Sequence, residues 1–221
     1  CLAMAQWVER HGAYLDCSSA GELYIASQAG LPRDRIISHG VNKSDVDLLA
    51  AIQQSGTIVV DNLNELQRLI TLFHGRVDPT PAAFPKIWLR LRPGVSVPSH
   101  SHVQTGQVDS KFGLSPQEFL QAVQSCLTYE LPLDGLHFHL GSQMHSPEPI
   151  NSAIEIALDL IKDCQNQTGW LPAVFCPGGG CGVPYHEADL PYMPLENFIQ
   201  SIAEKLTTGC RARPAGRERG R

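Results

Sequence analysis

The chain has 221 residues, of which 43% are hydrophobic and 18% charged, a balance typical of a globular protein with a sizeable core. Its net charge of −5 gives no electrostatic basis for binding nucleic acid or an anionic membrane. It contains no long apolar run and no signal-peptide pattern, and its seven cysteines are scattered without a C-x-x-C pair. We therefore expect a cytoplasmic protein with reduced thiols rather than a disulfide or zinc framework.

Apolar, β-rich runs alternate with amphipathic helical patterns along the chain. Ser19-x-x-Glu22 and Ser115-Pro116-x-Glu118 are capping-box patterns that predict helix starts. A long helix is predicted over residues 148–168, before Gly169. The predicted strands lie at residues 13–17, 35–39, 57–61, 86–91, 133–140 and 173–177.

Strands that alternate with helices predict an α/β fold with a parallel sheet and right-handed crossovers. Side chains that can take part in binding or catalysis lie where the strands end, as they do at the mouth of a (β/α)₈ barrel. Doubly wound open sheets follow a similar rule. The pattern favours a partial barrel of about six βα units. One connection, residues 92–114, is far longer than a usual βα loop, which is typical of a functional or disordered segment. The strand-end residues are Asp16, His39, Asp61, Arg90, His139 and Gly178.

The most informative stretch is residues 135–143, Gly-Leu-His-Phe-His-Leu-Gly-Ser-Gln. In a strand, His137 and His139 point to the same face, and the turn at Gly141-Ser142 offers a hydroxyl and backbone N–H groups. A flat imidazole beside such a turn suits an aromatic ring that carries a phosphate. The glycine run 178–180 follows a later apolar strand and suits the same anion. Together these features predict a pyridoxal phosphate site.

Other interpretations of these motifs remain open at this point. Both histidines are also consistent with core residues, and the glycine run with a flexible loop. A His-x-His strand also begins metal-dependent amidohydrolase barrels, but there it lies on the first strand and is completed by later ligands, so we expect no metal site here. His100 and His102, in the long loop, are expected to be solvent-exposed.

The chain resembles the fold-type III pyridoxal phosphate decarboxylases, the family of the diaminopimelate, ornithine and arginine decarboxylases. The resemblance covers residues 13 to about 206, and its motifs look most like those of diaminopimelate decarboxylases. The matching segments, in family order, are Asp16 to Leu23, His39 to Ser44, Arg90 to Gly94, Asp109 to Gly113, Gly135 to Gln143 and Gly178 to Tyr185.

The resemblance implies an alanine racemase-like barrel that holds pyridoxal phosphate at its mouth, a C-terminal β-domain and a homodimer. It implies decarboxylation of an amino acid, with meso-diaminopimelate to lysine first and ornithine or arginine as alternatives. By position, His139 would stack on the cofactor ring, and Ser142 with Gly178, Gly179 and Gly180 would cradle its phosphate. Arg90 would lie near the ring edge or the substrate, and Lys111 near the subunit interface.

The chain departs from the family pattern at both ends. The family's Schiff-base lysine would precede Cys1, and its Glu-Pro-Gly-Arg strand would follow the last helix, so we expect no catalytic residue within this chain. The sequence predicts a barrel domain over residues 1–208 that is inactive and marginally stable alone. Residues 209–221 are expected to form an arginine-rich disordered tail. A non-catalytic pyridoxal-phosphate-binding remnant is the alternative function.

Four further side chains receive simple structural interpretations. Lys43 and Lys111 are expected to be surface charges rather than Schiff-base formers. Asp16 and Asp61 are expected to cap the helices that follow their strands.

Overall fold

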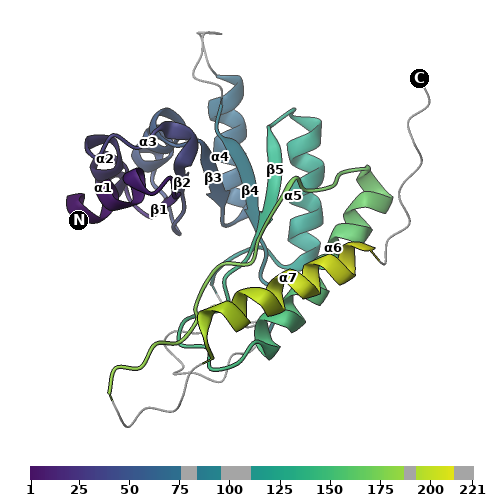
Figure 1. Ribbon diagram of the computed structural model, residues 1–221. Coiled ribbons are helices and arrows are strands. Elements are labelled where there is room, and N and C mark those ends of the chain that lie inside the picture. The colour runs from purple at the N-terminus through teal and green to yellow at the C-terminus, as the bar shows by residue number, and fades with distance from the viewer. Residues whose placement is uncertain (76–83, 96–110, 187–192, 212–221) are drawn as a thin grey trace, which may run out of the picture.

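The computed structural model describes residues 1–75, 84–95, 111–186 and 193–211. Within them, six parallel strands form one sheet in the order β1-β2-β3-β4-β5-β6 (Figure 1). Every predicted strand is present, each somewhat shorter than its apolar run. The strands are β1 Leu15–Cys17, β2 Ile36–Ser38, β3 Thr57–Val60, β4 Lys86–Arg90, β5 Leu133–His137 and β6 Val174–Cys176.

Helices connect the strands, and their ends follow the local chemistry of the sequence. Ser115 and Glu118 form the predicted reciprocal capping box, and Gly169 ends the long helix with a φ of 76°. A second full capping box, Ser44 with Asp47, was not predicted although its Ser-x-x-Asp pattern is visible in the sequence. The helices are α1 Leu2–Arg10, α2 Ala20–Gln28, α3 Asp45–Gln54, α4 Leu63–His74, α5 Pro116–Thr128, α6 Glu148–Thr168 and α7 Leu195–Arg211, with a 3₁₀ turn at Arg33–Arg35.

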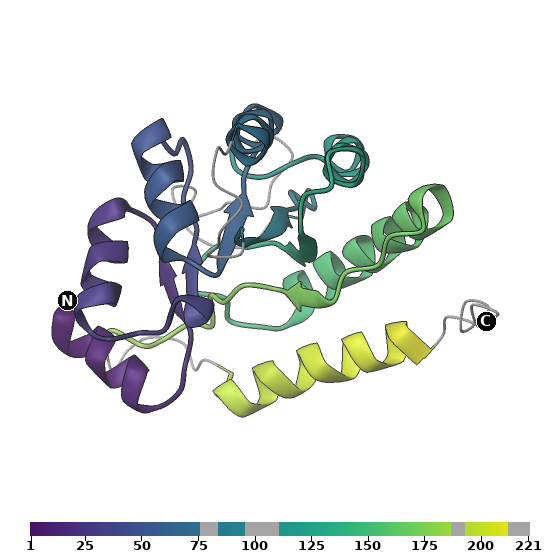
Figure 2. The same cartoon turned by 90° about the horizontal axis from the view of Figure 1, so that it is seen from above.

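The sheet is curled as a half-barrel, with the helices outside its curve (Figure 2). Strictly sequential strand order distinguishes this arrangement from the doubly wound sheet, in which the order reverses and helices cover both faces. The core lies between the strands and the helices, where the side chains of Ile58, Leu89 and Leu136 are fully buried against residues such as Leu66 and Phe119. The partial barrel expected from the sequence is confirmed.

Helix α7 packs along α6 and lies apart from the strands (Figure 2). Asn151 on α6 donates a hydrogen bond to the Ser201 hydroxyl at 2.9 Å, and Gly209 lies directly against Leu158. Residue 209, expected to begin the tail, thus lies in a packed part of α7, and the helix extends to Arg211, whereas residues 212–221 lie outside the described residues. Among the described helices, none is long and apolar enough to cross a membrane.

Candidate functional site

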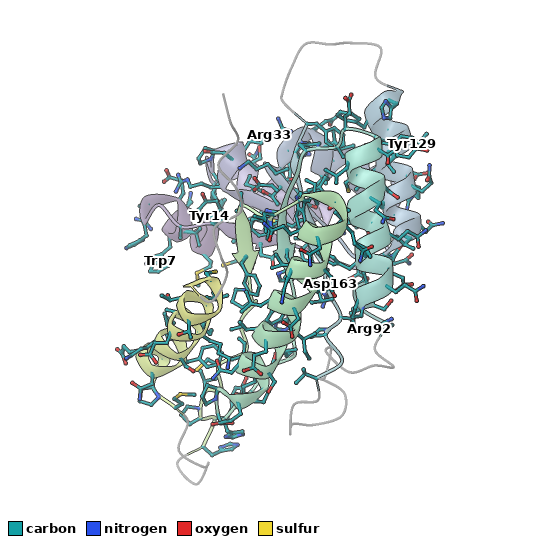
Figure 3. All side chains as sticks on the ribbon, turned by 90° about the vertical axis from the view of Figure 1, so that its right-hand side faces the viewer. Trp7, Tyr14, Arg33, Arg92, Tyr129 and Asp163 are labelled. Atoms are coloured by element: carbon teal, nitrogen blue, oxygen red, sulfur yellow. The ribbon has the colours of Figure 1, made fainter. Side chains whose placement is uncertain are left out.

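The carboxyl ends of all six strands meet at one end of the half-barrel. Figure 3 shows Arg92, which follows β4, toward that end, while Arg33 and Tyr129, which precede β2 and β5, lie toward the other. The residues that we singled out from the sequence are therefore brought together at a single mouth.

At the ends of β2 and β5, two histidine rings meet edge to face. The centroids of His39 and His137 are 4.7 Å apart, and their planes are inclined by 83°. His39 Nδ1 lies 3.2 Å from a carboxylate oxygen of Asp16, and His137 Nδ1 lies 3.3 Å from the Cys176 sulfur. The Nε2 atoms of both rings are buried and have no hydrogen-bond partner within the described part of the chain. Two buried imidazole nitrogens are therefore left without a partner by the described part of the fold.

The electrostatics keep the imidazoles of His137 and His139 neutral at neutral pH. Burial is the main cause that holds the pKa of His137 well below 6.5, and the charges of His39 and Arg90 act in the same direction. Burial also lowers the pKa of His139, with Arg90 as the next cause. A cluster of neutral rings accepts hydrogen bonds and offers flat faces without adding positive charge to the mouth.

The glycine turn after β6 lies directly against His139. A Cβ atom on Gly178 would be 3.0 Å from His139 Nδ1 and 2.6 Å from the Phe138 carbonyl oxygen, and the backbone φ of 70° also favours glycine. Beside Gly179, in contrast, there is open space. Among the described residues, the N–H groups of Gly179 and Gly180 donate to no backbone carbonyl. The predicted ring-stacking residue and the predicted phosphate cradle are thus neighbours.

Ser142 belongs to a segment that runs alongside the same turn. The Met144 N–H donates to the Gly180 carbonyl at 2.8 Å, and the Gly182 N–H donates to the Met144 carbonyl at 3.0 Å. This short parallel bridge holds the segment after β5 next to the glycine turn. Ser142 is exposed, so its hydroxyl is accessible at the rim. Whether it contacts a phosphate stays a prediction.

Arg90, at the end of β4, forms a buried ion pair. Its Nη1 donates to Asp61 Oδ1 at 2.8 Å, and its guanidinium carbon lies 4.9 Å from the centroid of the Phe112 ring. The expectation that Asp61 and Asp16 cap helices is wrong, because Asn62 caps α4 and Ser19 caps α2. The two carboxylates instead hold Arg90 and His39, respectively. Sequence order alone does not reveal partners that lie on neighbouring strands.

Lys43 is not the surface charge that we expected. Only 5% of the residue is exposed, and its Nζ donates to Glu65 at 2.7 Å and to the carbonyl oxygens of Gly40 and Val59 at 2.8 Å each. Glu65 is 2% exposed, and burial raises its pKa although Lys43 opposes this. Lys111 is exposed, as expected, with its Nζ 5.2 Å from the Phe112 ring centroid.

Within the described residues, no group of three or more histidine, cysteine, aspartate or glutamate side chains has the geometry of a metal site. His100 and His102 lie outside the described residues, as do Asp109 and Ser110 of the resemblance motif.

Two larger cavities lie near the sheet, and only one of them touches the site. A cavity of about 790 Å³ is lined by residues at the opposite, amino-terminal ends of the strands, among them Tyr14, Lys86 and Asp134. Another, of about 650 Å³, lies between the glycine turn and the apolar side chains of α7, including Phe198 and Ile202. The second cavity leaves one side of the glycine turn accessible.

Comparison with known proteins agrees with this geometry. Residues 2–218 match the family described as "Pyridoxal-dependent decarboxylase, pyridoxal binding domain". The chain belongs to this family. The match extends over almost the whole sequence, so every element of the site described above lies within the pyridoxal-binding domain.

Three relatives illustrate the similarity. The diaminopimelate decarboxylase of Halalkalibacterium halodurans is 35% identical over 206 residues, which are 91% of this chain and 46% of that protein. The crystal structure of Helicobacter pylori diaminopimelate decarboxylase complexed with L-lysine superposes with a TM-score of 0.82 at 26% identity, covering 93% of this chain and 51% of that one. A lysine/ornithine decarboxylase from Vibrio vulnificus, complexed with cadaverine, has a TM-score of 0.73 at 26% identity and covers 94% and 49%. The chain therefore spans about half the length of the relatives it matches.

Proposed function

We propose that this chain binds pyridoxal 5'-phosphate at the mouth of its half-barrel and forms the cofactor-binding half of an amino-acid decarboxylase. The observation that carries the proposal is the close approach of His139 to the glycine turn. A Cβ atom added to Gly178 would lie only 3.0 Å from His139 Nδ1. This approach places a flat neutral ring beside a cluster of backbone donors, which is what an aromatic phosphate ester requires.

The residues present fit such a cofactor. The N–H groups of Gly179 and Gly180 are suited to phosphate oxygens, and the exposed Ser142 hydroxyl lies on the neighbouring segment. Arg90 donates from Nη1 to Asp61 at the same mouth, where its guanidinium would lie near the cofactor or the substrate. The unpartnered Nε2 atoms of His39 and His137 provide hydrogen-bonding groups that the fold itself leaves unused.

When bound, the cofactor supplies an electron sink that makes loss of an α-carboxylate feasible. The residues of this chain bind and orient it. His139 fixes the plane of the ring, the glycine turn fixes the phosphate end, and the buried Arg90–Asp61 pair keeps one wall of the site rigid. Because His137 and His139 stay neutral, they do not compete with the phosphate-binding groups for the anion.

For the complete decarboxylase we propose meso-diaminopimelate as the substrate and lysine as the product. The names of the relatives support this, and the similarity to a lysine/ornithine decarboxylase makes a smaller basic amino acid the second candidate. A cytoplasmic homodimer is part of the same proposal.

The 221-residue chain alone is proposed to bind the cofactor without covalent attachment and without turnover. Lys43 has all three of its N–H donors engaged, and Lys86 lies at the opposite ends of the strands. Lys162 and Lys205 are on the outer helices α6 and α7, and Lys111 lies over Phe112. We therefore expect that borohydride treatment fixes no pyridoxyl group to this chain.

Equilibrium dialysis against pyridoxal phosphate tests the proposal. His139→Ala removes the stacking face, and Gly179→Val introduces a side chain into open space at the cradle; we expect each to weaken binding by roughly tenfold or more. His74→Ala, an exposed histidine on α4, is the matched control and should bind as the wild type does. Wild-type binding that none of these changes affects would contradict the proposed site.

The substrate is tested separately, because the relatives are about twice as long as this chain. This test uses the protein expressed from the gene together with its flanking coding sequence. We expect carbon dioxide release from meso-diaminopimelate to exceed that from ornithine or arginine. Preferred turnover of ornithine or arginine would reassign the substrate. No turnover together with cofactor binding would support the non-catalytic alternative.

A further inference from the structure

A buried lysine joins a loop, a strand and a helix near the carboxyl ends of the strands. Lys43 Nζ binds the Gly40 carbonyl in the loop after β2, the Val59 carbonyl on β3 and the Glu65 carboxylate on α4. An ammonium group has three N–H donors, and here each has its own acceptor. The loop after β2 is therefore tied to β3 and to the first turn of α4 by one side chain.

The loop held in this way carries His39. Gly40 follows it directly and adopts a φ of 103°, and a Cβ at this position would be 2.9 Å from the Ser18 carbonyl oxygen of the loop after β1. The other anchor of the ring is the contact between Nδ1 and Asp16, a residue whose side chain is 58% exposed. An exposed carboxylate is a weak restraint on its own, because water competes for the hydrogen bond.

We propose that the buried Lys43–Glu65 pair is a positioning element that fixes the His39 imidazole, and that His39 Nε2 is a ligand-binding atom of the site. His39 Nε2 is buried and without a partner among the described residues, at the edge of the His137 ring. Because a carboxylate only accepts hydrogen bonds, Nδ1 carries a proton toward Asp16, and in this tautomer Nε2 offers a lone pair. The ligand class is one with an N–H or O–H donor.

Stability alone does not account for this pair. Replacement of a buried ion pair by apolar side chains of similar volume is often neutral or stabilising. Here the cost is increased by Glu65 Oε2, which is buried without a partner, and burial raises the Glu65 pKa. The three bonds of Lys43 tie the loop that carries His39 to β3 and α4. We therefore explain this energetically costly pair by its control of the position of that loop.

The first test measures the His39 ring directly in the ligand-free chain. The double variant Lys43→Met/Glu65→Leu removes both charges and keeps the volume, and ¹⁵N NMR of the imidazole reports which nitrogen bears the proton. We expect the wild type to hold the Nδ1–H form and the double variant to lose this preference. Lys43→Arg is the second variant, because it retains the buried charge but cannot place three donors on one nitrogen.

The matched control is Lys205→Met, because Lys205 also pairs with a glutamate, Glu155, but does so on the outer helices. It should leave the His39 signals unchanged. A folded Lys43 variant that keeps the wild-type His39 signals would overturn the proposal.

The second test concerns ligand binding and rests on the proposed function. In the double variant, pyridoxal phosphate should bind roughly tenfold more weakly, the size of about one hydrogen bond, with far-UV circular dichroism unchanged. His39→Phe should cause a similar loss without altering Lys43. If the wild-type chain itself does not bind the cofactor, the proposed function fails, and the His39 signals still decide the positioning role. Wild-type affinity in both variants would overturn the assignment of His39 as a binding residue.

Discussion

The Arg90–Asp61 pair allows the sharpest prediction about what holds the site together. Asp61→Ala removes the carboxylate with which Arg90 forms its ion pair. The side chains are 6% and 2% exposed, so the guanidinium that remains has almost no access to water. The change leaves a buried, uncompensated charge beside the Phe112 ring.

The burial of the pair sets the size of the expected loss in the free energy of unfolding. Breaking a buried pair by removing one partner costs about 3–5 kcal/mol, whereas an exposed pair contributes about 0–1 kcal/mol. The chain supplies its own exposed comparison, Arg68 with Asp45, whose side chains are 32% and 79% exposed. We therefore expect Asp61→Ala to lower the free energy of unfolding by at least about 2 kcal/mol more than Asp45→Ala does.

Urea unfolding followed by far-UV circular dichroism measures this difference. The double variant Arg90→Met/Asp61→Leu should recover most of the loss, because it removes the unpaired charge together with its partner. If the Asp61→Ala chain is already unfolded in the absence of urea, the double variant decides the outcome. A folded double variant then agrees with the expectation, and an unfolded one does not. Equal effects of Asp61→Ala and Asp45→Ala would refute the reasoning.

Three further predictions concern pH, the glycine turn and the sheet edges. Because the folded state keeps His137 neutral while the unfolded chain binds a proton below pH 6.5, the free energy of unfolding should fall as the pH drops below 6.5, by up to about 1.4 kcal/mol per pH unit. His137→Gln should flatten this slope in urea titrations at several pH values, and an unchanged slope would contradict the assignment. Gly178→Ala should destabilise the chain by about 1–3 kcal/mol in urea, whereas Gly179→Ala should not, because only the first has a positive φ and a backbone clash. Strands β1 and β6 pair on one side only among the described residues, so sedimentation should show concentration-dependent self-association that Val174→Lys reduces; a monomer at all concentrations would contradict this.

The elements of this fold were predictable because their signals are local. The boundaries of α6, residues 148–168, match the sequence prediction because Pro147 and Pro149 stand at its start and Gly169 at its end. The capping boxes act over three residues, so they too can be found without knowledge of the fold. The choice between a barrel and an open sheet was harder, because it depends on the order of strands in space.

The site was predictable where it follows strand ends, and unpredictable where partners come from different strands. His139 and the glycine run could be placed together, since both follow parallel strands and so meet at one edge. The Arg90–Asp61 pair joins residues 29 positions apart, and Lys43 meets Glu65 across 22 positions. For Asp61, a nearby helix start suggested capping, but Asn62 takes that role and leaves the carboxylate for Arg90.

The distribution of charge at the mouth explains which ligand the site can recognise. The two buried cations, Lys43 and Arg90, are each neutralised by a carboxylate of their own, so neither presents a bare charge. The Nε2 atoms of His39 and His137 are two of the three buried side-chain polar atoms without a partner in the described chain. The third is Oε2 of Glu65, whose other carboxylate oxygen accepts a hydrogen bond from Lys43. We therefore expect recognition in the centre of the site to depend on hydrogen bonds from the ligand and on ring faces. We expect an anionic group to bind at the glycine turn, where backbone N–H groups rather than side-chain cations are available.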